Sequence, residues 1–368
     1  MIKIKYPNDK TAFEADYIGL FSITPEIQDK YVRINAHLNN HLPNSLEELL
    51  VAPIETLITS CFQIPRLPKH LQRYLKNFFQ YDDFQNKISY FFIRNKNKIN
   101  LKTCYYCNID FINAFQDIGD YNDGLDFVKK ASENELEKIK DIGTATIQKI
   151  LAQRGLINSL QDLTLNNKQK INIENFVLKD EHSHFTLDHV LNKAKHPISA
   201  LSLYNFVPCC YSCNSKFKGK KELINEVNEA ILSPTYSNFS FHEHSSFKIL
   251  LNSKVADFKG IKKNEDFVVV VEFLENADKY KKYLEVFKLK GRYKSHKHIA
   301  LELINKSQDY SDTQIEEISK LVNRPVALIK SDIFGKNIFE GTLEDNPFTK
   351  YSRDIASNIG IKDVKLID

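Results

Sequence analysis

The sequence predicts an α+β fold that is predominantly helical. Residues 1–100 are expected to be mostly helical, with apolar residues at helical spacing through Leu46–Cys61 and Leu71–Phe79, and the chain is expected to become helical again beyond residue 280. Two runs that follow Tyr236, FSFHEHSSFKILL and FVVVVEFL, are rich in the aromatic and β-branched residues that favour strands. The length of 368 residues predicts two or three domains, and the apolar fraction of 42% is ordinary for a globular protein.

Residues 1–100 are predicted to form a helical N-terminal region. Ser45 and Glu48 make a capping box in front of the sequence LEELL, and such a box marks the start of a helix. Pro65 and Pro68 are predicted to interrupt the helices. Nothing in this region indicates a catalytic group, and its basic side chains are better explained as a solvated helix face.

Positive charge is concentrated in two segments, although the net charge of the chain is only +4. Residues 189–221 contain six lysines and no acidic residue, and residues 279–297 contain seven lysines and one arginine against a single acidic residue. Clusters of this kind, with tyrosines interleaved in the second, predict a surface for a polyanion such as a nucleic acid. A solvated helix face is the alternative.

The sequence contains no signal that would direct it into or across a membrane. Its beginning, MIKIKYPNDK, lacks the apolar core of a secretion signal, and no window has the roughly 18 apolar residues that a membrane span requires. We therefore expect a cytoplasmic protein without a membrane partner. In a reducing compartment, paired cysteines favour metal binding over disulfide formation.

Two Cys-x-x-Cys pairs predict a closed tetrahedral Zn²⁺ site with a structural role, because two residues between the cysteines let both thiolates reach one ion. The four ligands would be Cys104, Cys107, Cys210 and Cys213. The pairs lie 102 residues apart, which is tolerable if the intervening chain is an excursion whose ends meet. Cys209 is an alternative to Cys210, and buried thiols without a metal remain the alternative to the site as a whole.

Residues 117–180 are predicted to form an insert between the two cysteine pairs. Ser132 and Glu135 make a capping box, and a turn at Gly143 separates the first helix from a second one that carries apolar residues at helical spacing. This pattern resembles a helix-hairpin-helix of the kind found in DNA-uptake proteins.

The helix-hairpin-helix resemblance implies that the insert contacts a phosphate backbone. The turn at Gly143 would offer backbone N–H groups to a phosphate, and Lys149 and Arg154 would add positive charge. Asp141 stands where that family usually has glycine, and a carboxylate there would repel phosphate. A purely structural insert therefore remains the alternative.

The stretch FTLDHVLNKAKHPISALSLYNFVPCCYSCNSKFKGKK, residues 185–221, contains three groups of polar residues in a fixed order. These groups are the pair Asp188–His189, then Asn205, and then a Cys-x-x-Cys followed directly by Asn214. Together with the upstream cysteine pair, they resemble the HNH nucleases, the ββα-metal family of enzymes that cut phosphodiester bonds. Asn214 in the third position makes this an HNN variant.

The resemblance assigns a role to each polar residue. Asp188 and Asn214 would bind one Mg²⁺ or Mn²⁺, and oxygen ligands suit such a hard cation. His189 would act as the general base on water, and Asn205 would hold the intervening loop and orient His189. His182, His184 and His196 lie nearby and are expected to be structural or exposed.

Local patterns around these residues predict strand, loop, strand and helix. The first strand would end at Asp188–His189, the second would be ended by Pro208, and a helix would begin near Asn214 and continue to residue 232. The lysines of that helix are expected beside the nucleic-acid backbone, where they would give affinity without sequence information. These lysines are Lys216, Lys218, Lys220 and Lys221.

These observations predict three regions and one activity. A nuclease core over residues 101–235 would follow the N-terminal region, and an α/β region over residues 236–368 would pack on the core or hold substrate. The resemblance implies cleavage of DNA to 5′-phosphate and 3′-hydroxyl ends, in bacterial anti-phage defence or mobile-element biology, with a defence-system partner subunit as one option. The alternatives are an HNH toxin that cuts RNA or tRNA and a zinc-containing nucleic-acid-binding subunit without catalysis.

Overall fold

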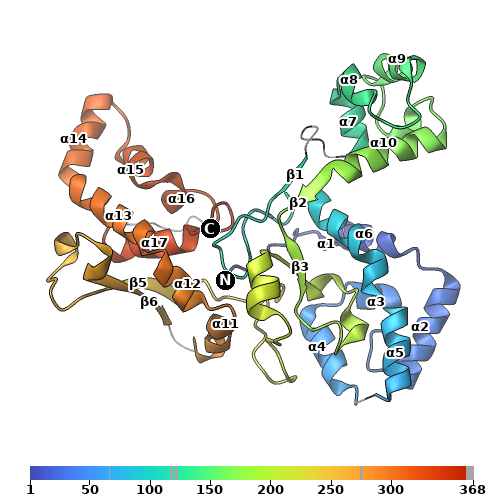
Figure 1. Ribbon diagram of the computed structural model, residues 1–368, viewed down its shortest axis with the longest axis horizontal. Helices are drawn as coiled ribbons and strands as arrows, with labels where there is room; N and C mark the ends of the chain where they lie inside the picture. The colour runs from blue at the N-terminus through green and yellow to red at the C-terminus, as the bar shows by residue number, and fades with distance from the viewer. Residues whose placement is uncertain (66, 117–118, 120, 122, 274–276, 362–368) are drawn as a thin grey trace.

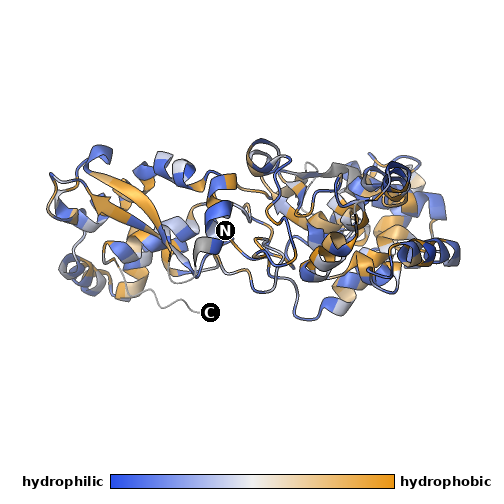
Figure 2. Ribbon diagram, turned by 90° about the horizontal axis from the view of Figure 1, so that it is seen from below, coloured by the Kyte–Doolittle hydropathy of each residue, from blue (hydrophilic) through white to orange (hydrophobic). Residues whose placement is uncertain are grey.

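The computed structural model describes residues 1–368 except 66, 117–118, 120, 122, 274–276 and 362–368 (Figure 1). Within the described residues, helices predominate and the strands form three two-stranded antiparallel sheets. The prediction of a mixed, mostly helical α+β chain is therefore confirmed. Figure 2 shows hydrophobic and hydrophilic residues alternating along the helices, as expected of amphipathic helices.

The N-terminal region is helical, as predicted. Ser45 caps its helix by accepting a hydrogen bond from the backbone N–H of Glu48 at 3.1 Å, and prolines 53 and 68 stand directly before helices. The helices are α1 (Lys10–Ile18), α2 (Pro25–His37), α3 (Leu46–Leu50), α4 (Ile54–Gln63), α5 (Lys69–Phe78) and α6 (Tyr81–Arg94).

The segment between the two cysteine pairs leaves and re-enters the structure through paired strands. Strands β1 (Ala114–Gln116) and β2 (Glu181–Ser183) are antiparallel, with Ala114 opposite Ser183. Between them, the helices pack around a hydrophobic cluster of their own, and Figure 1 shows them projecting from the rest of the chain. The helices are α7 (Gly124–Lys130), α8 (Glu133–Leu136), α9 (Thr144–Gln153) and α10 (Asn167–Asp180).

The central segment contains two paired strands and a short helix. Strand β3 (Thr186–His189) is antiparallel to β4 (Phe206–Cys209), and the π-type helix η5 (Ser212–Lys218) follows. Pro208 lies inside β4, opposite Leu187, rather than ending the strand.

The prediction of a helix reaching residue 232 is wrong. Helix η5 stops at Lys218 because Gly219 adopts a positive φ of 50°, which breaks the helical backbone. The following segment is irregular over residues 222–231 and buries the adjacent side chains of Leu223 and Ile224. Burial of these two residues in the main core outweighs the helical periodicity that the sequence shows.

The C-terminal region packs helices on a third strand pair. Strands β5 (Ser245–Leu251) and β6 (Phe267–Phe273) are antiparallel along their full length. Asp354 of helix α17 accepts a hydrogen bond from the N–H of Phe247 at 3.0 Å, so the helix satisfies part of the edge of β5. The helices are α11 (Lys281–Val286), α12 (Leu289–Ser295), α13 (Lys297–Asp309), α14 (Asp312–Val322), α15 (Val326–Phe334), α16 (Lys336–Phe339) and α17 (Thr349–Asn358).

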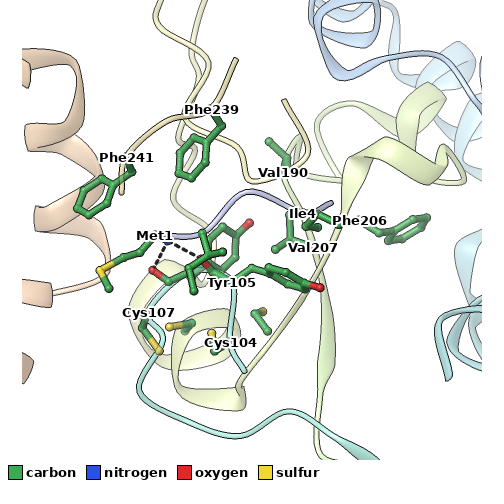
Figure 3. Close-up of a cluster of buried hydrophobic side chains, with 14 of the residues drawn as sticks. Met1, Ile4, Cys104, Tyr105, Cys107, Val190, Phe206, Val207, Phe239 and Phe241 are labelled. Atoms are coloured by element: carbon green, nitrogen blue, oxygen red, sulfur yellow. Dashed lines mark hydrogen bonds between the residues drawn. The ribbon is translucent and has the colours of Figure 1, made fainter. Parts of the chain in front are cut away.

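The N-terminal, central and C-terminal regions share one hydrophobic core. Buried residues from all three belong to a single cluster, separate from the cluster of helices α7–α10. Figure 3 shows part of this core, where Met1 and Ile4 lie close to Tyr105 of the first cysteine pair. The backbone N–H of Ile2 donates to the carbonyl of Tyr105 at 2.9 Å. The first cysteine pair is therefore embedded in the core.

Candidate active site and metal centre

Four cysteines from the two Cys-x-x-Cys pairs come together in the core. Their sulfur atoms are buried and lie within 4.8 Å of one another, and the Sγ atoms of Cys107 and Cys210 are 4.0 Å apart. Four sulfurs around one zinc ion at about 2.3 Å would be separated by about 3.8 Å. The cluster, which consists of Cys104, Cys107, Cys210 and Cys213, therefore fits a tetrahedral metal ion.

Backbone geometry positions these sulfurs. The N–H of Cys107 donates to the carbonyl of Cys104 at 3.2 Å, which closes the turn of the first pair, and the N–H of Cys210 donates to the sulfur of Cys104 at 3.3 Å. Cys209 lies on the other side of β4, where its sulfur is 3.7 Å from the carbonyl of Thr186. The cluster thus uses Cys210 rather than Cys209 because successive residues of an extended chain point to opposite sides.

Arg292 of helix α12 lies against this cluster and was not singled out by the sequence. Its guanidinium donates to the sulfurs of Cys213 at 3.2 Å and Cys107 at 3.4 Å, and it stacks 4.8 Å from the ring centre of Phe217. A cation at this position balances thiolate charge and holds the C-terminal region on the cysteine cluster. In the sequence, Arg292 is one basic residue in a lysine-rich run, so no local pattern distinguishes it.

A cleft of about 590 Å³ lies beside the β3–β4 strand pair. It brings together Asp188, His189 and Asn214 of the predicted site, together with Lys218. Helix α6, strand β3, the loop that follows β3 and helix η5 supply its walls. Among the described residues that line it are also Tyr81, Gln85, Ser89, Asn192 and Lys193.

The imidazole of His189 is fixed by one backbone contact and two rings. Its Nε2 lies 3.0 Å from the carbonyl oxygen of Ala200, and the rings of Tyr81 and Phe206 pack against it, each with its centre 4.7 Å away. Since a carbonyl only accepts hydrogen bonds, Nε2 carries the proton and Nδ1 keeps a lone pair. Burial lowers the pKa of His189 to about 3, so the ring is neutral near pH 7.

Asn205 holds the loop between β3 and β4. Its side-chain amide donates to the carbonyls of Leu191 at 3.1 Å and Ser199 at 2.9 Å, and its oxygen accepts from the N–H of Leu191 at 2.7 Å. Asn205 is fully buried, and its side-chain hydrogen bonds go to Leu191 and Ser199 rather than to the ring of His189. Asn205 therefore acts on His189 through the loop. It binds Ser199, and the next residue, Ala200, contacts the ring of His189.

Asp188 is buried and has a partner on each carboxylate oxygen. Oδ1 lies 3.0 Å from the ammonium of Lys218, and Oδ2 accepts a hydrogen bond from the hydroxyl of Tyr106 at 2.6 Å. Burial raises the pKa of Asp188, while the Lys218 charge and the Tyr106 hydroxyl oppose that shift. Tyr106 lies between the cysteines of the first pair and was not singled out from the sequence, where the cysteines themselves are the recognisable pattern.

The four lysines of the central stretch are placed differently from one another. Lys216, Lys220 and Lys221 are exposed, whereas Lys218 is only 2% exposed and also donates to the carbonyl of His189 at 2.8 Å. Lys218 is thus part of the cleft and not of the surface on which it was expected. The side-chain nitrogen of Asn214 lies 3.5 Å from the carbonyl of Leu187.

The residues expected to contact phosphate lie along and at the two ends of α9. Gly143 precedes α9, and Lys149 is exposed, but the guanidinium of Arg154 donates to the carbonyl of Ala131 at 3.1 Å within the insert. The carboxylate of Asp141 is paired with Lys168 at 2.8 Å. The structure does not place Gly143, Lys149 or Arg154 among the residues that line the cleft beside β3.

The nearby histidines pack on aromatic rings. Phe115 has the rings of His182 and His184 centred 5.3 Å and 5.0 Å away, and His196 packs on Phe62 at 5.0 Å. His196 also faces Glu222, with Nε2 3.6 Å from a carboxylate oxygen. His189 lines the cleft beside β3, whereas these three histidines are not among the described residues that line it.

Comparisons with known proteins leave the chain without an assigned family. A scan against known protein families, a search of curated proteins and a search of solved structures each returned no match. Within the part of the chain that the structure describes, every helix falls short of the length and apolar character needed to cross a membrane.

Proposed function

We propose that this chain is a metal-dependent endonuclease of the HNH type that hydrolyses phosphodiester bonds in DNA. The observation that carries the proposal is the arrangement of His189, whose Nε2 is bound to the Ala200 carbonyl while Nδ1 keeps its lone pair at a cleft. A neutral imidazole held in this way keeps a lone pair that can take a proton from water. The adjacent Asp188 and the nearby Asn214 supply the oxygen atoms that such chemistry requires.

The four-cysteine cluster is proposed to hold a structural Zn²⁺. Four buried sulfur ligands leave no position open for water or substrate, which is typical of structural zinc sites. The metal would link the first cysteine pair to the end of β4 and to helix η5. The same helix carries Asn214 and Lys218, so the zinc would also fix one wall of the cleft.

The cleft has the donor chemistry for a second, divalent cation. Asp188 and Asn214 both border it, and carboxylate and amide oxygens are the ligands that Mg²⁺ and Mn²⁺ prefer. Each carboxylate oxygen has more than one lone pair, so the contacts of Asp188 with Tyr106 and Lys218 do not exhaust its capacity. When bound, such a cation would polarise the scissile phosphate and stabilise the departing oxygen.

The chain's own residues perform the remaining tasks. His189 accepts a proton from the attacking water at Nδ1, and the Ala200 carbonyl keeps the ring in the required tautomer and orientation. Asn205 holds the loop that carries Ala200. Attack of the water oxygen on phosphorus expels the 3′-oxygen, which takes a proton from solvent, and gives the 5′-phosphate and 3′-hydroxyl products that we propose.

Substrate contact is proposed to rest on exposed lysines around the cleft. Lys193 lines the cleft, and Lys216, Lys220 and Lys221 follow on or just after helix η5 with exposed side chains. Lysines that contact phosphates give affinity without reading sequence. We favour DNA over RNA because the sequence of the insert resembles a helix-hairpin-helix, and because the charge of Asp141 beside its turn is neutralised by Lys168.

Plasmid cleavage by purified protein tests this proposal. Zinc-loaded wild type, His189→Ala and the control His37→Ala are compared with Mg²⁺, with Mn²⁺ and in metal-depleted buffer, since a strong chelator would also extract structural zinc. His37 is an exposed histidine on α2, so its removal should leave cleavage unchanged. We expect cleavage that needs a divalent metal and is lost only in His189→Ala.

Two outcomes would contradict the proposal. Cleavage retained by folded, zinc-loaded His189→Ala would exclude His189 as the base. Folded wild type that cuts neither plasmid nor total RNA under any metal would exclude the nuclease, while cleavage of RNA alone would replace DNA as the substrate.

A further inference from the structure

Lys218 is an unusual lysine because its charged end is buried in the wall of a cleft. The residue is 2% exposed, and its ammonium has two oxygen partners, Oδ1 of Asp188 at 3.0 Å and the carbonyl of His189 at 2.8 Å. A buried ammonium is strongly unfavourable unless it is paired, and the same holds for a buried carboxylate. Each group of the Lys218–Asp188 pair therefore makes the burial of the other possible.

In the metal-free protein, the ammonium of Lys218 balances the negative charge of the Asp188 carboxylate. Lys218 is the charged group that acts on the Asp188 carboxylate, and the other polar contact of that carboxylate is the neutral hydroxyl of Tyr106. A divalent cation that binds Asp188 would enter beside the ammonium already present. Because like charges repel strongly where water is largely excluded, the ammonium and the divalent cation cannot both bind this carboxylate tightly.

We propose that the ammonium of Lys218 and the catalytic divalent cation are alternative partners of Asp188. The lysine holds the carboxylate in the metal-free protein and gives up this contact when the divalent cation binds. The inference rests on the proposed function only in taking Asp188 as a ligand of that cation.

The structure offers Lys218 a way to release Asp188. Lys218 is the last residue of helix η5, and Gly219 follows with a positive φ and an exposed backbone. Its ammonium keeps the carbonyl of His189 as a second acceptor, and its side chain borders a cleft of about 590 Å³ that can take up the displaced charge. The exchange therefore needs a side-chain movement and no rearrangement of the strands.

Direct measurement of Mn²⁺ binding tests the proposal without reference to nuclease activity. Mn²⁺ is titrated into zinc-loaded wild type, Lys218→Met and Lys218→Arg, with free Mn²⁺ followed by electron paramagnetic resonance. Methionine keeps most of the length of the side chain and removes its charge, so Lys218→Met should bind Mn²⁺ on the order of tenfold more tightly than wild type. Lys218→Arg keeps the charge and should not bind it more tightly.

Two variants serve as controls. Lys216→Met removes an exposed charge from the same helix and should leave the Mn²⁺ affinity within about twofold of wild type, as expected for a solvent-screened charge. Asp188→Asn combined with Lys218→Met should lose the gain in affinity. Equal or weaker Mn²⁺ binding by Lys218→Met would overturn the proposal even if the wild type is an active nuclease.

Thermal unfolding provides a second readout that remains informative if Lys218→Met is unstable. This variant leaves the Asp188 carboxylate buried without its counter-ion, so it should unfold at lower temperature than wild type in metal-depleted buffer. Added Mn²⁺ should raise its unfolding temperature more than that of wild type, because the ion takes the place of the lost ammonium. An equal or smaller rise would refute the exchange.

Discussion

The hydroxyl of Tyr106 lies 2.6 Å from Oδ2 of Asp188, and this contact joins the cysteine cluster to the candidate active site. Tyr106 stands between Cys104 and Cys107, so the turn that presents two sulfur ligands also presents the hydroxyl. Its ring stacks on Phe287 with a centre-to-centre distance of 4.3 Å, which fixes the hydroxyl in place. The geometry of the cysteine cluster is thereby transmitted to a buried carboxylate.

Tyr106→Phe should separate the support that Tyr106 gives to Asp188 from zinc binding by the neighbouring cysteines. Phenylalanine keeps the stacking on Phe287 but removes a hydrogen bond to a charged group, which should cost about 1.5–3 kcal/mol of unfolding free energy. We expect full zinc content together with weaker Mn²⁺ binding and slower DNA cleavage. Denaturant unfolding, zinc analysis and the plasmid assay measure these effects.

Tyr105→Phe is the matched control for Tyr106→Phe. Tyr105 is the neighbouring residue of the same turn, and its hydroxyl donates to the backbone carbonyl of Ile99 rather than to Asp188. The control should therefore lose stability without any change in Mn²⁺ affinity. Equal loss of Mn²⁺ affinity in both variants would show that the contact with Asp188 has no special role.

Cys210→Ser should lower the metal content, whereas Cys209→Ser should leave it unchanged. The two cysteines are adjacent and buried, but the cluster contains Cys210, while Cys209 lies against Thr186. Loss of one thiolate from four should remove most bound zinc and destabilise the core, since structural zinc contributes directly to folding. Zinc measured after desalting should fall toward none in Cys210→Ser and stay at one per chain in Cys209→Ser.

Arg292→Met should weaken metal retention without removing a ligand. The guanidinium donates to two cluster sulfurs, and loss of such a supporting contact typically costs about 10- to 100-fold in metal affinity. Competition with a zinc-binding dye measures this change. Lys290→Met removes an exposed charge from the same helix and should leave zinc affinity unaltered. A similar loss of zinc affinity in both variants would show that Arg292 acts through its charge in general and not through its contacts with the sulfurs.

The sequence predicted the parts of the site that are encoded by short spacings. Two residues between cysteines define a turn, and the capping box of Ser132 and Glu135 is present as predicted, because both patterns depend only on neighbouring residues. The same holds for the pair Asp188–His189 at the end of a strand. Local rules of backbone geometry suffice for such features.

The contacts that complete the site are not local. Tyr106 meets Asp188 across 82 residues of sequence, and Arg292 meets Cys107 across 185. The burial of Lys218 was unexpected for the same reason, since a lysine is normally exposed and only the fold supplies the carboxylate that compensates its charge. A periodic pattern within one segment cannot predict a contact between residues that lie so far apart in the sequence.

His242 should make the stability of the folded chain depend on pH. Burial, followed by the charge of Lys350, lowers the pKa of His242 to about 4. The unfolded chain then binds a proton more readily between pH 4 and about 6.5, so the contribution is complete above pH 6.5 and is lost as the pH falls. The titratable groups that face His242 are Lys350, Lys5, Lys3, the amino group of Met1 and Glu243.

The comparison of wild type with His242→Gln isolates this effect. Between pH 7 and pH 5, wild type should lose about 2 kcal/mol more unfolding free energy than the variant, because glutamine cannot take up the proton. Urea unfolding at the two pH values measures the difference, and His37→Gln, which replaces an exposed histidine, should behave like wild type. If wild type and His242→Gln lose the same free energy, His242 does not titrate as its burial requires.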